Sequence, residues 1–335
     1  MTALAISARP GNDTALRPVP WRRMAWVTWR QHRSTLAGVA GLLGALAAFL
    51  LFTGLPMHHA YAAVAACHPA GSLACSNAIV DFDNVHWSMA EAMAVLLQVV
   101  PALIGAFAVA PVLARELETG TFRYAWTQGF GRERQAIAKL ALVGLTLAVL
   151  AWAFSELFSW FFQPFLWVEQ MNQISTEAVF DTRGLVFPAF TLVSFAIGAF
   201  LGMLFRRIVP AMAATLGVYF AIRLVAWSVR GQYPLTVVTS NAKQFTAYGT
   251  PSQPGFPWIL NSWITGPGGK LASQSVIKGG SGNQVASVPK GYTLWTRFFP
   301  PSHFWPMQVI EAGWLLVLAV AIGAATVWLV RQRAA

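Results

Sequence analysis

The chain contains few charged residues and even fewer acidic ones. Only 10% of its 335 residues are Asp, Glu, Lys or Arg, against about 25% in soluble domains, and 56% are hydrophobic. Mean hydropathy is +0.54. This shortage of charge excludes an ordinary soluble protein and indicates a membrane protein. The formal net charge is +11. We infer no nucleic-acid binding from it, because much of the positive charge lies at the ends of apolar segments.

Motifs of nucleotide-binding and hydrolytic enzymes are also missing from the sequence. The stretch Gly268-Gly-Lys270 is the nearest approach to an ATP-binding loop, but Ile264 replaces its first glycine and Leu271 replaces its Ser/Thr. Neither a Gly-x-Ser-x-Gly nor a His-Glu-x-x-His motif is present. We therefore expect no enzymatic activity, no catalytic residue and no cofactor in this chain. Any ATP and Mg²⁺ would be bound by a partner subunit.

Cysteine is almost absent, and its two copies lie close together. Cys67 and Cys75 fall in one predicted outer loop, where an oxidising compartment would favour a disulfide, with free thiols as the alternative. The same loop is rich in imidazole and carboxylate groups, which are common metal ligands. These residues are His58, His59, His68, His86, Asp81 and Asp83. Their spacing matches no metal-binding motif, so we predict no metal site.

Long apolar runs dominate the remaining sequence. A helix needs about 20 apolar residues to cross about 30 Å of hydrocarbon, and six segments meet this requirement. They are residues 35–55, 93–114, 136–162, 185–205, 209–229 and 309–330. The sequence therefore predicts an all-α membrane protein with a cytoplasmic tail (1–34), five spans (35–230), an extracellular loop or cap (231–307) and a sixth span with the C-terminus (308–335).

The positive charges predict how these spans are oriented. Lys and Arg concentrate in the N-terminal tail, after the second and fourth spans, and at the C-terminus. Because cytoplasmic loops carry an excess of Lys and Arg, both termini are expected in the cytoplasm of a cell-membrane protein. Residues Trp21–Arg33 place several apolar side chains on one helical arc and four arginines on the other. This pattern favours an interfacial amphipathic helix, although a simple cytoplasmic extension of the first span would also explain it.

The long segment between the fifth and sixth spans shows no strong periodicity. It is rich in Gly, Pro, Ser, Thr and Asn, which is typical of irregular structure. We predict an irregular outer loop or small cap, with short helices around Phe256–Ile264 and Thr293–Phe299.

Four ionisable residues fall inside or at the edges of the predicted spans: Glu91, Glu156, Arg223 and Glu311. Helical rise places all four in the outer half of the membrane. Charged groups in a membrane are costly and usually face protein or water. We therefore hypothesise that Arg223 pairs with Glu156 or Glu311. Separate snorkelling to the outer headgroups is the alternative.

The most informative segment is the charged stretch between the second and third spans, residues 115–134. Gly120 can end a helix and Thr121 can cap the next one, which would make Phe122–Phe130 a short aromatic helix below the membrane. Such a helix can dock into a soluble partner. A self-contained turn packed on the protein's own helices is the other interpretation.

This segment also carries a family resemblance. The pattern Glu116-x-Glu118-x-Gly120-Thr121, followed by Arg132 or Arg134 and then Lys139, resembles the signature of type-2 ABC transporter permeases. The stretches 29–33 and 304–313 resemble actinobacterial members of that group. The resemblance covers essentially the whole chain, although the segment between the last two spans is longer than is usual in the family.

The resemblance implies that the protein is the permease subunit of an ATP-driven exporter. It would form a dimer with a second permease copy or a close paralogue, contact membrane lipid and bind a pair of ABC ATPase subunits. Its export substrate would be an amphipathic molecule such as a drug, a peptide or a lipid. Glu116, Glu118, Gly120, Thr121 and Arg123 would belong to the coupling helix within residues 116–128. A membrane-embedded lipid-modifying enzyme that uses the His-rich loop, and a ligand-binding sensor or immunity protein, are the competing hypotheses.

Overall fold

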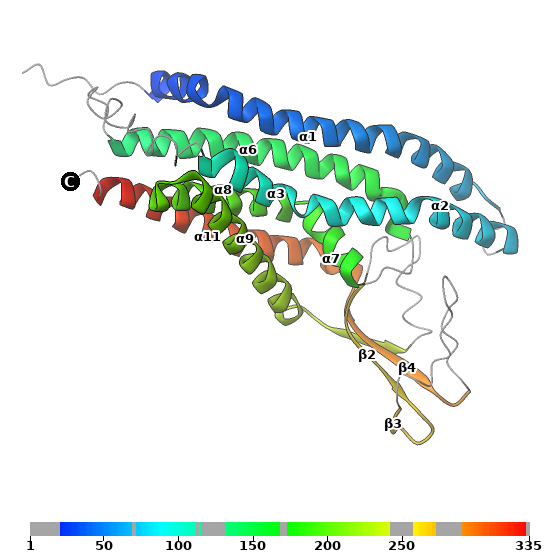
Figure 1. The fold of residues 1–335 in the computed structure, drawn as a ribbon. Helices are drawn as coiled ribbons and strands as arrows, with labels where there is room; N and C mark the ends of the chain where they lie inside the picture. The colour runs from blue at the N-terminus through cyan, green and yellow to red at the C-terminus, as the bar shows by residue number, and fades with distance from the viewer. Residues whose placement is uncertain are drawn as a thin grey trace, which may run out of the picture.

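The computed structural model describes residues 21–68, 72–111, 114, 132–167, 173–241, 257–272 and 290–332. Within these residues, six helices are long and apolar enough to cross a membrane. They pack as a bundle, with a small β-sheet at one end (Figure 1). The predicted all-α membrane fold is therefore confirmed.

The spans are built from the following elements. The first three contain α1 (Trp21–Ala65), then α2 (Leu73–Leu97) with α3 (Val100–Leu103) and the π-helix η1 (Ile104–Val109), then α6 (Arg132–Phe162) with η2 (Gln163–Trp167). After the short helix α7 (Gln173–Thr182) come α8 (Val186–Phe205), α9 (Ile208–Val229) with η3 (Arg230–Gln232), and η6 (Pro301–His303) with α11 (Phe304–Gln332).

The two ends of the bundle differ. The beginnings of α1 and α6 and the end of α11 lie at one end, which we call the terminal end (Figure 1). The opposite end, which we call the sheet end, holds the end of α9 and the β-sheet. An even number of spans brings both ends of the described chain to the same end of the bundle.

The segment predicted as an outer loop after the first span is helical. α1 continues to Ala65 and α2 begins at Leu73, because Ala and Met, which favour helix, occur in both extensions. At 1.5 Å per residue the 45 residues of α1 measure about 68 Å. The hairpin of α1 and α2 therefore extends beyond a hydrocarbon layer of about 30 Å. A disulfide joins Cys67 to Cys75 at its tip, which confirms that pairing.

The predicted interfacial helix is the first part of α1. The helix runs from Trp21 to Ala65 without a break, so residues Trp21–Arg33 are continuous with the first span. The structure thus supports the simple extension rather than a separate amphipathic helix.

Helix α8 lies at the centre of the bundle. In its most apolar stretch 83% of the residues are buried, against 17–28% for α1, α6, α9 and α11. Glycines bring it close to the π-helix: a Cβ added at Gly198 would lie 2.5 Å from the carbonyl oxygen of Gly105. The two backbones are therefore in direct contact, which small residues permit between membrane helices.

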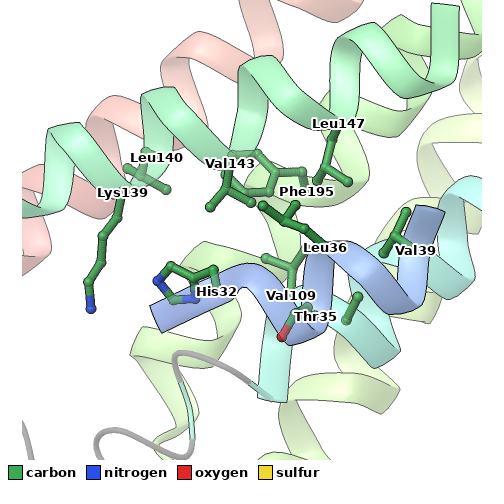
Figure 2. Close-up of a pocket in the computed structure, with 11 residues that line it drawn as sticks. His32, Thr35, Leu36, Val39, Val109, Lys139, Leu140, Val143, Leu147 and Phe195 are labelled. Carbon is green, nitrogen blue, oxygen red and sulfur yellow. The ribbon is translucent and has the colours of Figure 1, made fainter. Parts of the chain in front are cut away.

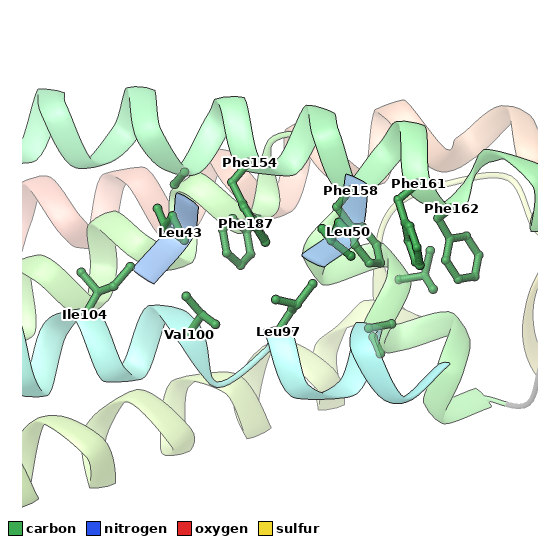
Figure 3. Close-up of a cluster of buried hydrophobic side chains, with 14 of the residues drawn as sticks. Leu43, Leu50, Leu97, Val100, Ile104, Phe154, Phe158, Phe161, Phe162 and Phe187 are labelled. Carbon is green, nitrogen blue, oxygen red and sulfur yellow. The ribbon is translucent and has the colours of Figure 1, made fainter. Parts of the chain in front are cut away.

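Phenylalanines from α6 fill the interior toward the sheet end. Phe154, Phe158, Phe161 and Phe162 are buried together with Phe187 of α8 (Figure 3). Leucines from α1 and α2 complete this apolar cluster. The cluster holds α1, α2, α6 and α8 together by close packing and van der Waals attraction between apolar side chains.

The described parts of the segment between the last two spans form a four-stranded antiparallel sheet. Its strands are β1 (Val238–Asn241), β2 (Trp258–Thr265), β3 (Leu271–Ala272) and β4 (Thr293–Phe299), in the order β1-β4-β2-β3. The two short helices predicted around Phe256–Ile264 and Thr293–Phe299 are wrong, because those stretches form β2 and β4. Their aromatic and β-branched residues favour strands once pairing is available.

Candidate functional site

The residues predicted to contact an ATPase lie outside the described part of the chain. These residues are Glu116, Glu118, Gly120, Thr121 and Arg123. Their described neighbours are Ala114, which is fully buried, and Arg132, which begins α6. The coupling role of this segment therefore stays a prediction.

The membrane helix that precedes this segment has an irregular backbone. Pro101 lies at the start of α3, and the six-residue π-helix η1 follows directly. Single π-turns inside membrane helices often occur at functional sites. Because Gly105 contacts α8 within this π-helix, any movement of η1 must involve α8.

A narrow apolar cavity of about 40 Å³ lies between α1, η1, α6 and α8. Figure 2 shows His32 and Lys139 toward one end of the cavity and Val39 and Leu147 toward the other. Its lining is aliphatic apart from Thr35, His32, Lys139 and the ring of Phe195. The cavity would accommodate an apolar group with polar atoms at the terminal end.

A larger groove of about 680 Å³ adjoins this cavity. It lies between α1 and the α3–η1 segment, and it shares Thr35, Val39 and Ala108 with the cavity. Phe107 on its wall is 56% exposed. This groove is large enough for part of an amphipathic molecule, and its lining side chains are apolar apart from Thr35.

The sheet end contains a network of buried charged side chains. Arg230, at the end of α9, is 2% exposed and contacts Glu177 and Asp181 of α7. Its guanidinium also binds Glu311 of α11, with Nε 2.7 Å from Oε2. Three helices are thereby joined through one side chain.

A second arginine extends the network. Arg223 lies on α9 about two turns before Arg230 and forms an ion pair with Asp181, with an N–O distance of 2.7 Å. It also donates a hydrogen bond to the side chain of Gln98, where α2 ends. The phenol of Tyr219 donates to the carbonyl of Gln98 at 3.2 Å. The network therefore includes the break between α2 and α3.

These contacts correct the sequence-based hypothesis for Arg223. Its ion pair within the described residues is with Asp181, and not with Glu156 or Glu311. Glu311 is instead the partner of Arg230 and is fully buried. Glu156 is exposed on α6. Arg223 and Glu311 are connected indirectly, because Arg223 contacts Asp181, Asp181 contacts Arg230, and Arg230 contacts Glu311.

Aromatic residues surround the network and connect it to the sheet. The Arg230 guanidinium lies 4.9 Å from the ring centre of Phe180 and 5.7 Å from that of Trp258, the first residue of β2. Tyr233 donates a hydrogen bond to Glu311 at 3.0 Å. Because Trp258 is itself 7% exposed, the base of the sheet is part of the packed structure of the membrane domain.

Two polar side chains reinforce the turn between α7 and α8. Gln308 of α11 is fully buried; it accepts hydrogen bonds from the backbone N–H groups of Leu185 and Val186 and donates one to the carbonyl of Phe180. The hydroxyl oxygen of Ser155 lies 2.9 Å from the carbonyl oxygens of both Thr182 and Gly184, which share its single proton. These bonds satisfy backbone groups that would otherwise be buried without partners.

Burial changes the acidity of Glu177. It raises the pKa of Glu177 from 4.5 to about 7, and although Arg230 lowers this pKa, Asp181 and Glu311 reinforce the increase. Three carboxyl groups face two guanidinium groups in the network. If all five were ionised the cluster would carry one excess negative charge, which a proton on Glu177 would remove.

The other two predicted intramembrane acids lie apart from this network. Glu91 is half-buried on α2, and Glu156 is exposed on α6. Burial lowers the pKa of Arg183 to about 10, and the charge of Glu156 opposes this decrease.

The His-rich stretch forms ordinary helix contacts in the described residues. His58 stacks on Trp160 with ring centres 4.4 Å apart, and its Nε2 is 3.0 Å from the Trp160 carbonyl. His86 packs on Phe82. Across the described ranges, no three His, Cys, Asp or Glu side chains gather as a metal site would require.

Sequence reasoning missed three members of the network: Glu177, Asp181 and Arg230. The first two are one helical turn apart in α7, a spacing that places both on one face, and this was the available signal. α7 itself was missed because its ten residues contain no long apolar run.

The fold and its buried polar cluster define a multi-pass helical membrane protein. Residues 40–230, more than half of the chain, match the family described as ABC-2 membrane transporter related, and the protein belongs to this family. Its members are normally the non-enzymatic membrane component of a transporter. A search of curated proteins gave no significant match.

Proposed function

We propose that this protein is the permease subunit of an ATP-driven exporter, which works as a dimer with a separate pair of ATPase subunits. The family match carries this proposal, because residues 40–230 include the predicted coupling segment and all or most of each of the first five spans. The substrate class that fits the apolar groove is an amphipathic molecule drawn from the membrane.

Charge supports placing the terminal end in the cytoplasm. Exposed arginines occur there on α1, on α6, on α11 and in the turn between α8 and α9: Arg22, Arg30, Arg33, Arg134, Arg206, Arg207 and Arg331. Cytoplasmic ends of membrane helices carry such an excess of positive charge. An ATPase in the cytoplasm could then reach residues 116–128, which lie between η1 and α6 in sequence.

The proposed coupling uses the two elements on either side of this segment. η1 lines both the cavity and the groove, and α6 lines the cavity. A force applied between them would change the space available to a substrate. ATP drives transport only if the ATPase binds one permease conformation more tightly than another.

The test is recovery of an ATPase with the tagged protein from membranes in mild detergent, with and without an ATP analogue. Reversal of Glu116 and Glu118 to Lys, or Gly120→Pro, should reduce the recovered ATPase at least about ten-fold, which corresponds to about 1.4 kcal/mol of binding. Membrane insertion should be unchanged, because these residues precede the third span.

Asp81→Lys provides the matched control. This acid is exposed on α2, toward the sheet end, so its reversal changes the charge as much as either single Glu reversal without touching the coupling segment. Equal ATPase recovery from the wild type and the Glu116/Glu118 variant would refute the coupling assignment. Within the described residues, no observation favours the lipid-modifying enzyme or the sensor.

A further inference from the structure

The segment between the last two spans is positively charged throughout. From residue 231 to residue 310 the sequence contains five Lys or Arg and no Asp or Glu. Three of the cations are in the described residues, and all three are exposed: Arg297 lies in β4, Lys270 directly precedes β3, and Lys290 lies in the turn before β4. This surface therefore differs from the network beneath it, where every arginine has a carboxylate partner.

The turn between β2 and β3 forms one tip of the sheet. The N–H of Gly266 donates to the carbonyl of Lys270 at 2.9 Å, which closes the turn. Gly268 and Gly269 have φ values of +84° and +76°, which glycine adopts without the steric cost of a Cβ. The tight turn holds Lys270 at the end of the hairpin.

The second lysine lies beside this turn. Pro267 of the turn lies within 3.5 Å of the Cβ position of Gly291, and the ring of Tyr292 packs against Gly266. Because Lys290 directly precedes Gly291, two exposed lysines flank the same tip. A surface that binds this tip must be negatively charged, because it would meet both ammonium groups at once.

One face of the sheet combines cationic and aromatic groups. Trp263 pairs directly with Trp295, and Asn261 pairs with Arg297. Directly opposed residues share a face of an antiparallel sheet, so both indoles and the guanidinium lie on the same side. Leu271, which pairs with Thr265 on that face, is 78% exposed.

The sheet is attached to the membrane domain without a linker. β4 ends at Phe299, and the last span begins at Pro301. Seven residues of strand at about 3.3 Å per residue reach about 23 Å from this point. In Figure 1 the sheet extends obliquely to the side of the bundle and does not cover the end of the α1–α2 hairpin.

We propose that this face and tip dock on the anionic headgroups of the membrane beside the sheet end. Lys270, Lys290 and Arg297 would pair with lipid phosphates, and Leu271 and the indoles would lie at the headgroup level. Indole, guanidinium and ammonium groups next to an exposed leucine are the combination that membrane interfaces favour. A soluble acidic partner would account for the cations but not for the exposed leucine.

That the lipids belong to the outer leaflet rests on the proposed function, which places the terminal end in the cytoplasm. The orientation and the docking can be tested separately. Both native cysteines are in the disulfide, so Asn77→Cys introduces a single reactive thiol. Asn77 is exposed on α2 near the tip of the α1–α2 hairpin, which the docked sheet does not cover. An impermeant thiol reagent on intact cells should label it. Absence of labelling would overturn the orientation alone, since the docking test below exposes both membrane faces.

Docking is measured with an environment-sensitive fluorophore on Leu271→Cys, in the full chain reconstituted into nanodiscs. The discs contain phosphatidylcholine alone or with phosphatidylglycerol. Emission should shift to the blue only with the anionic lipid. Each cation near an anionic surface contributes a factor of about five, so Lys270→Gln with Lys290→Gln should lower the docked-to-free ratio about 25-fold.

A fluorophore on Asn77→Cys is the matched control, because Asn77 is exposed on α2 near the tip of the α1–α2 hairpin. Its emission should not depend on lipid charge. Three results with the fluorophore at position 271 would overturn the proposal. The emission could fail to shift in either kind of nanodisc, or it could shift equally in both and be unaffected by the lysine substitutions. It could also shift in detergent, by an amount that grows with protein concentration. The last would indicate contact with a second copy of the chain.

Discussion

The two ends of this membrane domain are held together by different forces. At the sheet end, Arg230 joins three acidic side chains, Gln308 binds three backbone groups, and a disulfide closes the α1–α2 hairpin. At the terminal end, α1, η1 and α6 meet around an apolar cavity and a groove. In the described residues, directional contacts reinforce the phenylalanine cluster in the first region, whereas the second is lined mainly by apolar side chains.

The difference indicates which end is fixed and which can move. A buried ion pair or hydrogen bond stabilises one geometry and becomes costly when a partner moves away. Packed apolar helices can slide by small amounts without leaving a polar group unpaired. An exporter driven from the terminal end would therefore change shape around η1 and α6 while the sheet end keeps its arrangement.

Removal of the central arginine should give the largest effect. Arg230→Met leaves Glu177, Asp181 and Glu311 buried without their main cation, which should lower the free energy of unfolding by about 3–5 kcal/mol. Thermal unfolding in detergent measures it. Arg207→Met changes an exposed arginine at the other end of the same helix, and we expect a change within about 0.5 kcal/mol. Similar losses in both variants would contradict the contrast between the two ends.

The acidity of Glu177 should make the sheet end sensitive to pH. Its folded pKa of about 7 exceeds the ordinary 4.5, so the folded state binds more protons between these values. Stability should therefore fall as pH rises from about 4.5 to about 7, by up to about 3 kcal/mol. Unfolding measured across this range should show a smaller slope in Glu177→Gln. An unchanged slope would assign the dependence to another group.

Loss of the disulfide should weaken the sheet end to a smaller degree. Cys67 and Cys75 are eight residues apart, and a loop that short constrains the unfolded chain only modestly. Replacing both by Ser should lower the free energy of unfolding by about 2 kcal/mol. A reductant should reproduce this loss in the wild type and have no effect on the double variant. If the reductant destabilised the wild type and the double variant equally, reduction of the Cys67–Cys75 disulfide would not be the cause of the destabilisation.

The smallest stability effect should come from the helix contact near the terminal end. Gly198→Ala places a methyl group against the Gly105 carbonyl, and overpacking costs about 1–3 kcal/mol, partly offset by the better helix propensity of Ala. A net loss of about 1–2 kcal/mol is expected in thermal unfolding. Gly217→Ala on α9 has no heavy atom within 4 Å of the new methyl. This control should therefore be neutral or slightly stabilising, and an equal loss would show that the contact has no special role.

Several elements could be predicted because their signal is local. The expected span 185–205 corresponds to α8, Val186–Phe205, and the expected span 209–229 corresponds to α9, Ile208–Val229. In both, an uninterrupted apolar run ends at charged residues. α7 carries Glu177 and Asp181 but resembles a polar connector, and β2 and β4 were assigned as helices because their pairing partners are distant in sequence.

The sequence by itself determined the class of protein, the number of spans and the concentration of positive charge at one end. Each of these follows from composition within about 20 neighbouring residues, the length a helix needs to cross the membrane. Only the tertiary structure decided which charges meet. Arg230 is 81 residues from Glu311 and 49 from Asp181, and no local pattern links them. Their pairing depends on how α7, α9 and α11 pack around α8, where a buried charge is stable only next to its partner.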